Sequence, residues 1–270
     1  MKRILFILFI LTGFQCYSQI NMDSLLNELL HSNQYQKIEP TKRLLEEFQR
    51  YESTDGQELY EVYFDSTGKL NEYLGLTVSY FLKDKKGRTI KRVGYNLKGE
   101  YYLWDLNPIT EYKYLGDSTI TDYFDSKSKL EYRNLTIVDS QGRIIEKSEF
   151  DNQLQLVIKI ATFYNDKENE IIVKRIGRGD VLKPNKNGLS IQVKKTDSAD
   201  STFVIEEQFL DSNSELIDAD HNDLGRGIEL KYSYLKRKIQ NGETIENYYN
   251  VEGVEVCRVI DGISVLINAR

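Results

Sequence analysis

The sequence predicts a mainly β fold: an antiparallel meander of repeated strand and turn units that forms an extended, twisted or curved sheet, with a short N-terminal α-helical cap. From Leu59 onward, apolar residues alternate with polar ones at a period of two, which is the spacing of a strand with one buried face. One such run contains Leu74, Leu76, Val78, Tyr80 and Leu82. Between the runs, Asp or Asn is often followed three residues later by glycine, a spacing typical of hairpin turns. Residues 22–52 differ, because their apolar residues fall at helical spacing.

The beginning of the chain, residues 1–18, has the composition of a secretory signal peptide. A Lys-Arg pair precedes an apolar run over residues 4–11, which is far shorter than the roughly 20 residues that a spanning helix needs. Cys16 and Ser18 supply the small residues that cleavage before the next residue requires. We therefore expect an exported protein, located in the periplasm, at the outer-membrane surface or outside the cell, without a transmembrane segment in the mature chain. A lipid anchor on Cys16 is an alternative that Gln15 disfavours, since lipidated cysteines normally follow a small residue.

Residues 19–56 are expected to form the N-terminal helical segment. Helical spacing predicts a first helix over Met22, Leu25, Leu26, Leu29 and Leu30. Either Asp23 or Ser24 is its expected N-cap. A second helix is predicted after Pro40, with an apolar stripe formed by Leu44, Leu45, Phe48 and Tyr51. We expect this stripe to cover the edge or end of the following sheet; docking of an outside partner is the alternative.

Residues 57–270 are expected to form one β-repeat domain whose turns share a motif. The Asp or Asn side chain accepts backbone hydrogen bonds, and glycine at the fourth position accepts the positive φ of the turn. Ten turns align on this motif. Their first and fourth residues are Asp65 with Gly68, Asp84 with Gly87, Asn96 with Gly99, Asp125 with Ser128, Asp139 with Gly142, Asp151 with Leu154, Asp166 with Asn169, Asp211 with Ser214, Asn222 with Gly225, and Asn250 with Gly253. Positive φ is predicted at Gly68, Gly87, Gly142 and Gly253, and Asn169 is expected to substitute for glycine.

Several of these turns resemble a known group of repeats. The run Tyr63-Phe64-Asp65-Ser66-Thr67-Gly68-Lys69-Leu70, with weaker copies at residues 123–130, 139–144 and 249–254, resembles the Tyr-Asp repeats of the Rhs type. It is also similar to the shorter MORN-variant repeats of exported bacterial proteins. The resemblance implies a winding β sheet used as a shell, scaffold or binding surface, with no chemistry in the repeat itself. This chain has too few units for a large enclosing shell, so a toxin-encasing role is not expected.

The charge balance is acidic, with 42 Asp and Glu against 36 Lys and Arg. The short basic groups over residues 83–88 and 236–238 lie among carboxylates, as solvated surfaces usually do. A nucleic-acid partner is therefore not expected, because a polyanion binder needs clustered cations. If residues 1–18 are removed, Cys257 is the remaining cysteine, and an intramolecular disulfide cannot form.

One loop has the ligand spacing of a calcium site. Asp218, Asp220, Asn222 and Glu229 occupy positions 1, 3, 5 and 12 of an EF-hand-like loop. Against that interpretation, Asp223 stands at the sixth position, where the sharp turn of such a loop needs glycine, and strands flank the segment. We interpret it as an acidic hairpin loop and expect no calcium and no other cofactor.

No catalytic motif of high specificity can be written from this chain. The two histidines, His31 and His221, lie in a helix end and in the acidic loop, and no phosphate loop or nucleophile elbow occurs. An enzyme would depend on carboxylates alone, as glycoside hydrolases do. The alternative to a binding protein is therefore an envelope glycan-active enzyme with a carboxylate pair, and we expect a non-catalytic protein instead.

Aromatic residues are the most prominent candidates for binding. Tyr101, Tyr102, Trp104, Tyr112 and Tyr114 cluster within a short segment. Packing between strands accounts for such residues, but rings left on an exposed face would also form a platform for a glycan or a peptide. The sequence thus predicts an exported binding or scaffold module of the cell envelope, whose partner is an envelope protein, peptide or glycan.

Overall fold

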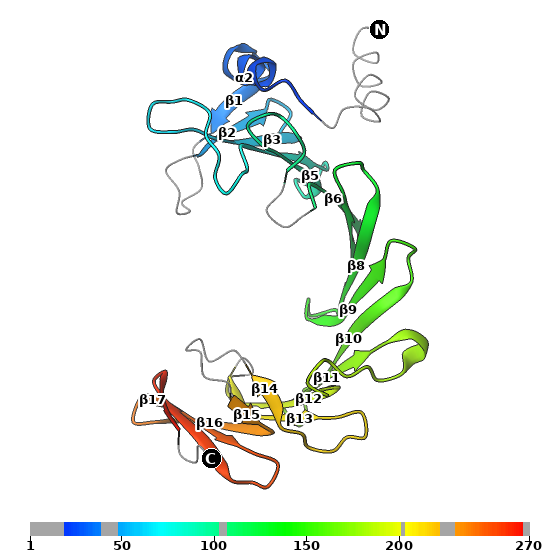
Figure 1. Cartoon of the computed structure of the whole chain (residues 1–270), viewed down its shortest axis with the longest axis vertical. Coiled ribbons are helices and arrows are strands. Elements are labelled where there is room, and N and C mark those ends of the chain that lie inside the picture. The colour runs from blue at the N-terminus through cyan, green and yellow to red at the C-terminus, as the bar shows by residue number, and fades with distance from the viewer. Residues whose placement is uncertain (1–18, 39–47, 103–106, 201–202, 222–229, 267–270) are drawn as a thin grey trace. The chain divides into compact units, whose positions relative to one another are not determined.

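The computed structural model describes residues 19–38, 48–102, 107–200, 203–221 and 230–266 (Figure 1). The chain divides into two compact units, residues 1–134 and 135–270, which are described separately. The prediction of one β-repeat domain over residues 57–270 did not include this division. The predicted signal peptide and Cys16 lie outside the described residues. Of the helices in the described ranges, none has the length and apolar composition to cross a membrane.

The elements are mostly strands. The first unit contains α2 (Met22–His31), β1 (Tyr35–Ile38), β2 (Phe48–Ser53), β3 (Glu58–Tyr63), β4 (Val78–Lys83), β5 (Thr89–Tyr95), β6 (Ile109–Leu115) and β7 (Ser118–Phe124). Residues of both units form β8 (Leu130–Val138). The second unit contains β9 (Ile144–Asp151), β10 (Leu156–Asn165), β11 (Glu170–Ile176), the 3-10 turn η1 (Arg178–Asp180), β12 (Ile191–Thr196), β13 (Val204–Leu210), β14 (Ala219–His221), β15 (Leu230–Tyr232), β16 (Tyr234–Gln240), β17 (Glu243–Tyr249), β18 (Glu255–Ile260) and β19 (Ile263–Leu266).

The strands form an antiparallel meander, which confirms the predicted fold class. In the first unit, each strand from β1 to β7 pairs with the next one along the chain. In the second unit, β9 to β13 pair in sequence, β13 pairs with β16, and β16 to β19 continue in order. The segment between β13 and β16 folds into a separate pair, β14 with β15.

The predicted first helix is confirmed as α2, with a different cap. Asn21, not Asp23 or Ser24, is the N-cap, and its side chain accepts a hydrogen bond from the backbone N–H of Ser24 at 2.9 Å. Met22 and Leu29 on one side of the helix are buried in the core of the first unit. Figure 1 shows the helix beside β1 and β2.

The predicted second helix is wrong where the structure describes it. Phe48 and Tyr51 belong to strand β2, and Phe48 pairs with Tyr63 of β3. Leu44 and Leu45 lie outside the described residues. Residues three apart share a helix face but lie on opposite faces of a strand. Tyr51 is accordingly buried in the core at 2% exposure, while Phe48 lies on the other side of the sheet.

One hairpin turn recurs along the chain, and Asp139 shows its geometry. Its Oδ1 accepts hydrogen bonds from the backbone N–H groups of Gln141 and Arg143, both at 2.9 Å. Two backbone bonds close the loop, from Gly142 N–H to the Asp139 carbonyl and from Asp139 N–H to the Arg143 carbonyl. The same four bonds form at Asp65, Asp84, Asn96, Asp125, Asp151, Asn185, Asp211 and Asn250. This is a type I turn followed by a left-handed residue.

The predicted positive φ angles are confirmed. Their values are 81° at Gly68, 75° at Gly87, 78° at Gly142 and 80° at Gly253. Residues other than glycine occupy the same conformation at Ser128, Leu154, Asn169 and Ser214. The turn predicted over residues 222–225 lies outside the described ranges.

A second structural feature recurs at the ends of four strands. There the chain runs beyond the paired strand and folds back on itself in a short hairpin. In each copy a backbone N–H returns to the carbonyl of the residue eight positions earlier, as from Asn71 to Tyr63 at 3.0 Å. The other copies are Tyr102 to Gly94, Lys183 to Arg175 and Ile217 to Phe209. Both units contain this device, so they are built from the same structural unit even though their sequences differ in length between turns.

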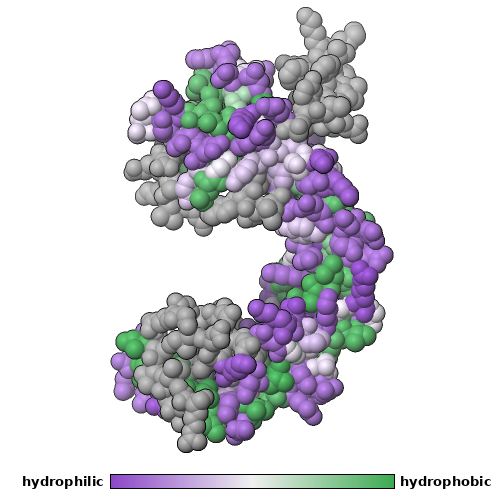
Figure 2. All heavy atoms as spheres, viewed as in Figure 1, coloured by the Kyte–Doolittle hydropathy of each residue, from purple (hydrophilic) through white to green (hydrophobic). Residues whose placement is uncertain are grey.

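Each unit has its own buried cluster. In the first unit it comprises Met22, Leu29, Tyr51, Val62, Phe64, Val78, Val93, Tyr95 and Ile109. In the second unit it comprises Phe209, Tyr232, Leu235, Tyr248, Cys257 and Val259. Apolar side chains also reach the surface among hydrophilic ones (Figure 2), including Leu115 at 60% and Phe163 at 53% exposure.

A buried carboxylate links three strands of the first unit. Asp122 on β7 has a side chain that is 3% exposed, and it accepts bonds from the Nε of Arg133 at 2.5 Å and from its Nη2 at 2.9 Å. The Nζ of Lys113 on β6 lies 3.1 Å from the same carboxylate. The hydrogen bonds from Arg133 hold the pKa of Asp122 below its ordinary value, and they outweigh burial, which acts to raise it.

Replacing Gly142 tests the turn. Gly142→Val should lower the free energy of unfolding by about 1 to 2 kcal/mol, because a β-branched residue resists positive φ. No atom lies within 4 Å of the position of the new Cβ, so backbone strain is the cause. Leu154→Gly, at the equivalent position, should leave stability equal or higher. Urea unfolding measures both, and a Val variant as stable as the wild type would contradict this account of the turn.

Replacing Asp122 tests the buried ion pair. Asp122→Asn should cost about 2 to 4 kcal/mol at pH 7, because Arg133 loses its charged partner. A carboxylate whose pKa is lowered in the folded state contributes fully to the free energy of unfolding above its unfolded-state pKa of about 3.9. That contribution is lost as the pH falls through the pKa of the folded state. The difference in the free energy of unfolding between the wild type and Asp122→Asn, measured by denaturant titration, should therefore become smaller below about pH 4. Lys113→Gln, at a side chain 53% exposed, should cost less than about 1 kcal/mol; equal losses for both variants would contradict the assignment.

Candidate binding surface

The sheet of the first unit has two faces of different character. Register places Val62, Val78, Val93 and Ile109 on one face, where they pack with α2. We call this the covered face. The residues between them in sequence point to the other side, which we call the open face; α2, the α-helix of the described residues, does not lie on it.

An aromatic row crosses the open face. Phe81 on β4 pairs with Arg92 on β5, which pairs with Thr110 on β6, which pairs with Tyr123 on β7. Tyr112 lies two residues beyond Thr110 on the same face. We define the aromatic row as Phe81, Tyr112, Tyr123 and Tyr132, which are all partly exposed.

The rings of the row contact one another and a cation. Tyr123 and Tyr132 are stacked, with ring centroids 4.2 Å apart and an angle of 15° between the planes. The guanidinium carbon of Arg92 lies 5.8 Å from the centroid of Phe81. Burial raises the pKa of Tyr112, and the charge of Arg92 offsets part of that rise. The row is thus a surface of flat rings around one cation.

Of the predicted tyrosine platform, Tyr112 lies in this row and Tyr114 has a structural contact. The Tyr114 hydroxyl donates to the carbonyl of Thr89 at 2.9 Å, and Arg88 lies 4.2 Å above its ring. The second unit repeats the arrangement: the Tyr164 hydroxyl donates to the carbonyl of Ile144, and Arg143 lies 4.1 Å above the ring. A contact that recurs in both units at turn ends stabilises the hairpin, so we assign Tyr114 to packing.

The other predicted tyrosines also pack. The ring of Tyr101 is tilted against that of Tyr95, with centroids 5.6 Å apart, and it packs against the core of the first unit. Tyr102 lies against Gly75, where a Cβ would come within 2.5 Å of the tyrosine ring, so only glycine fits there. Trp104 lies outside the described residues. The sequence cluster is therefore divided among the core, a turn contact and the open face.

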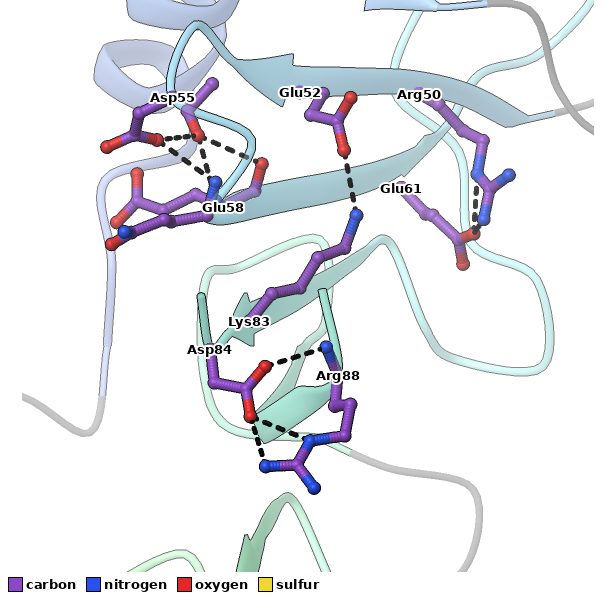
Figure 3. A network of polar contacts seen from close by, with 10 residues as sticks. Arg50, Glu52, Asp55, Glu58, Glu61, Lys83, Asp84 and Arg88 are labelled. Carbon is purple, nitrogen blue, oxygen red and sulfur yellow. Dashed lines mark hydrogen bonds and ion pairs between the residues drawn. The ribbon is translucent and has the colours of Figure 1, made fainter. Parts of the chain in front are cut away.

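The open face also carries ion pairs formed by residues of β2, β3 and β4 (Figure 3). Arg50 and Glu61 approach to 2.9 Å, and Lys83 and Glu52 to 2.8 Å. The first pair joins the neighbouring strands β2 and β3, and the second spans β3 between β2 and β4, so these charges neutralise one another.

Register, rather than sequence clustering, assembles the row. Phe81, Arg92, Tyr123 and Tyr132 come from four strands and were absent from the predicted platform. Their alternation within each strand was readable from the sequence. The pairing register decides which of the two alternating sets of side chains in a strand faces α2, and the register could not be predicted from the sequence.

The loop with calcium spacing is only partly described. The carboxylate of Asp218 accepts hydrogen bonds from the Ser233 hydroxyl and from the Val251 backbone N–H. Asp220 belongs to β14, while Asn222 and Glu229 lie outside the described ranges. Asp218 thus already has two donors from this chain, and the expectation that the four residues do not form a calcium site remains a prediction.

A calcium titration tests that expectation. Calcium up to millimolar concentration should leave the melting temperature unchanged, because we expect no calcium site in this loop. A ligand that binds only the folded state would raise the melting temperature. The measurement is thermal unfolding with and without calcium, with Glu229→Ala as the matched variant. A rise in the wild type that disappears in Glu229→Ala would show that the loop binds calcium.

Comparisons with known proteins give little guidance. No protein-family model and no curated protein sequence matches this chain. Among solved structures it is similar to TarM, and to a mutant of S. aureus TarM in complex with fondaparinux, alpha-GlcNAc-glycerol and UDP. The sequence identities are 12% and 11%, the TM-score is 0.20 for each, and each match covers 58% of this chain and 25% of that chain. At this TM-score the likeness supports no conclusion on fold or function.

Proposed function

We propose that this protein is an exported, non-catalytic binding module of the cell envelope, and that the open face of its first unit binds a glycan or a peptide. The observation that carries the proposal is the aromatic row. A sheet with α2 on one face leaves Tyr112, Tyr123 and Tyr132 partly exposed on the other. Rigid rings offer a large contact area at low entropic cost, and they are enriched at binding surfaces for that reason.

The ion pairs on the same face support this proposal over a reactive site. The carboxylate of Glu61 is held by Arg50 of the neighbouring strand, and that of Glu52 is held by Lys83 from two strands away, so these groups neutralise one another's charge. Export rests on the predicted signal over residues 1–18, and the resemblance to repeats of exported bacterial proteins agrees with it.

The proposal is tested by binding to isolated cell-envelope material. The purified protein should sediment with the envelope fraction, and the double variant Tyr112→Ala with Tyr132→Ala should bind at least fivefold less. Phe163→Ala is the matched control, since it removes a ring that is 53% exposed in the second unit. Equal binding by the double variant would exclude the open face. Release of soluble sugar by the wild type would favour the enzyme alternative.

A further inference from the structure

We propose that Arg92 binds an oxyanion of an acidic glycan, a carboxylate or a phosphate group, while sugar rings of that glycan lie on the aromatic row. This inference rests on the proposed function and adds the chemical class of the ligand. Three observations support it: the pairing of the arginines, the surroundings of Arg92, and the state of the sheet backbone.

Arg92 differs from most described arginines in having no carboxylate partner among the described residues. Those that form ion pairs are Arg50, Arg88, Arg133, Arg143, Arg178, Arg237 and Arg258. An acidic residue of the open face, Glu61, is held by Arg50 at 2.9 Å. Among the described residues, no carboxylate therefore pairs with the charge of Arg92, in a chain of net charge −6.

Arg175 in the second unit also lacks a carboxylate partner in the described part of the chain, but its surroundings differ. It pairs with Ile160 of β10, and no ring contact forms with it among the described residues. Arg92 instead has Phe81 at 5.8 Å. Arg92 thus combines a charge that no described carboxylate pairs with and a flat aromatic surface.

Part of the Arg92 side chain is enclosed by the protein. Its Nε is buried and has no hydrogen-bond partner in the described structure, so the stem is enclosed and the terminal Nη groups are the ones that a ligand can reach. Burial raises the pKa of Tyr63 and of Tyr112, and the positive charge of Arg92 offsets part of each rise. A guanidinium suits bidentate binding of a carboxylate or phosphate, because its planar fork of N–H donors matches the geometry of these groups.

The sheet backbone favours a glycan over a peptide. In β4 to β7 the backbone groups bond to the neighbouring strands. An extended peptide binds well where it can add backbone hydrogen bonds to a sheet edge, and a sheet face offers none. A sugar polymer needs ring faces for stacking and a few polar groups for orientation, which the aromatic row and Arg92 provide.

The test uses matched probes that differ in charge alone. Calorimetry of the purified full chain should show that a galacturonate hexamer binds at least tenfold more tightly than its methyl-esterified counterpart. A phosphorylated mannose hexamer, compared with its unphosphorylated form, tests phosphate as the source of the oxyanion. Preference for either acidic probe supports the proposal and identifies which oxyanion the site takes.

The variants separate the anion site from the ring surface. Arg92→Gln should lose the tenfold preference, and Arg92→Lys should keep part of it. Arg50→Gln, which removes a paired cation from the same face, should change affinity for the acidic probe less than twofold. Thermal unfolding of each variant shows whether it is folded. If Arg92→Gln is unstable, the partly retained preference of Arg92→Lys for the acidic probe still tests the proposal.

Other results would overturn the inference in distinguishable ways. Equal binding of acid and ester, unchanged by Arg92→Gln and lost in Tyr112→Leu, would remove the anion site and leave the proposed ring surface intact. Tighter binding of hexaglutamate than of every glycan, lost in Arg92→Gln, would replace the glycan by a peptide. Absence of binding to both acidic probes would overturn the acidic-glycan assignment, while the envelope assay decides the proposed function separately.

Discussion

The turn closed by an Asp or Asn side chain is the interaction on which both units depend. Oδ1 of Asp139 binds two backbone N–H groups that the strands leave unpaired, and Gly142 supplies the left-handed conformation that returns the chain. Each such loop fixes the register of the strands it joins, and register decides which residues share a face. A change at the turn would therefore move side chains between faces.

Register gives the first unit its covered and open faces. Val78 and Val93 reach α2 because they lie on one side of neighbouring strands, and Phe81 and Arg92 follow on the other side. Burial of the covered face against a helix stabilises the sheet through the hydrophobic effect. The four residues of the aromatic row on the open face stay partly exposed.

Local chemistry explains what the sequence predicted well and where it failed. Alternating apolar residues and the repeated turns were sufficient for the meander, and Gly68 and Asn169 have the predicted positive φ. The second helix failed because a short apolar stripe containing Phe48 and Tyr51 fits either period, and pairing with β3 selected the strand. Of the described tyrosines of the predicted platform, Tyr112 lies in the aromatic row, while Tyr101 packs against the core and Tyr114 makes a turn contact, because closeness in sequence does not by itself bring side chains together.

The sequence by itself determined the strand period, the turns and the first helix, because these depend on side-chain contacts with backbone only a few residues away. Tertiary structure decided the division at residue 134 and the burial of one face. It also brought Phe81, Arg92 and Tyr123 into one surface. These features depend on contacts between residues far apart in the chain, and any alternating strand can present either set of side chains to a helix until its partners fix the register.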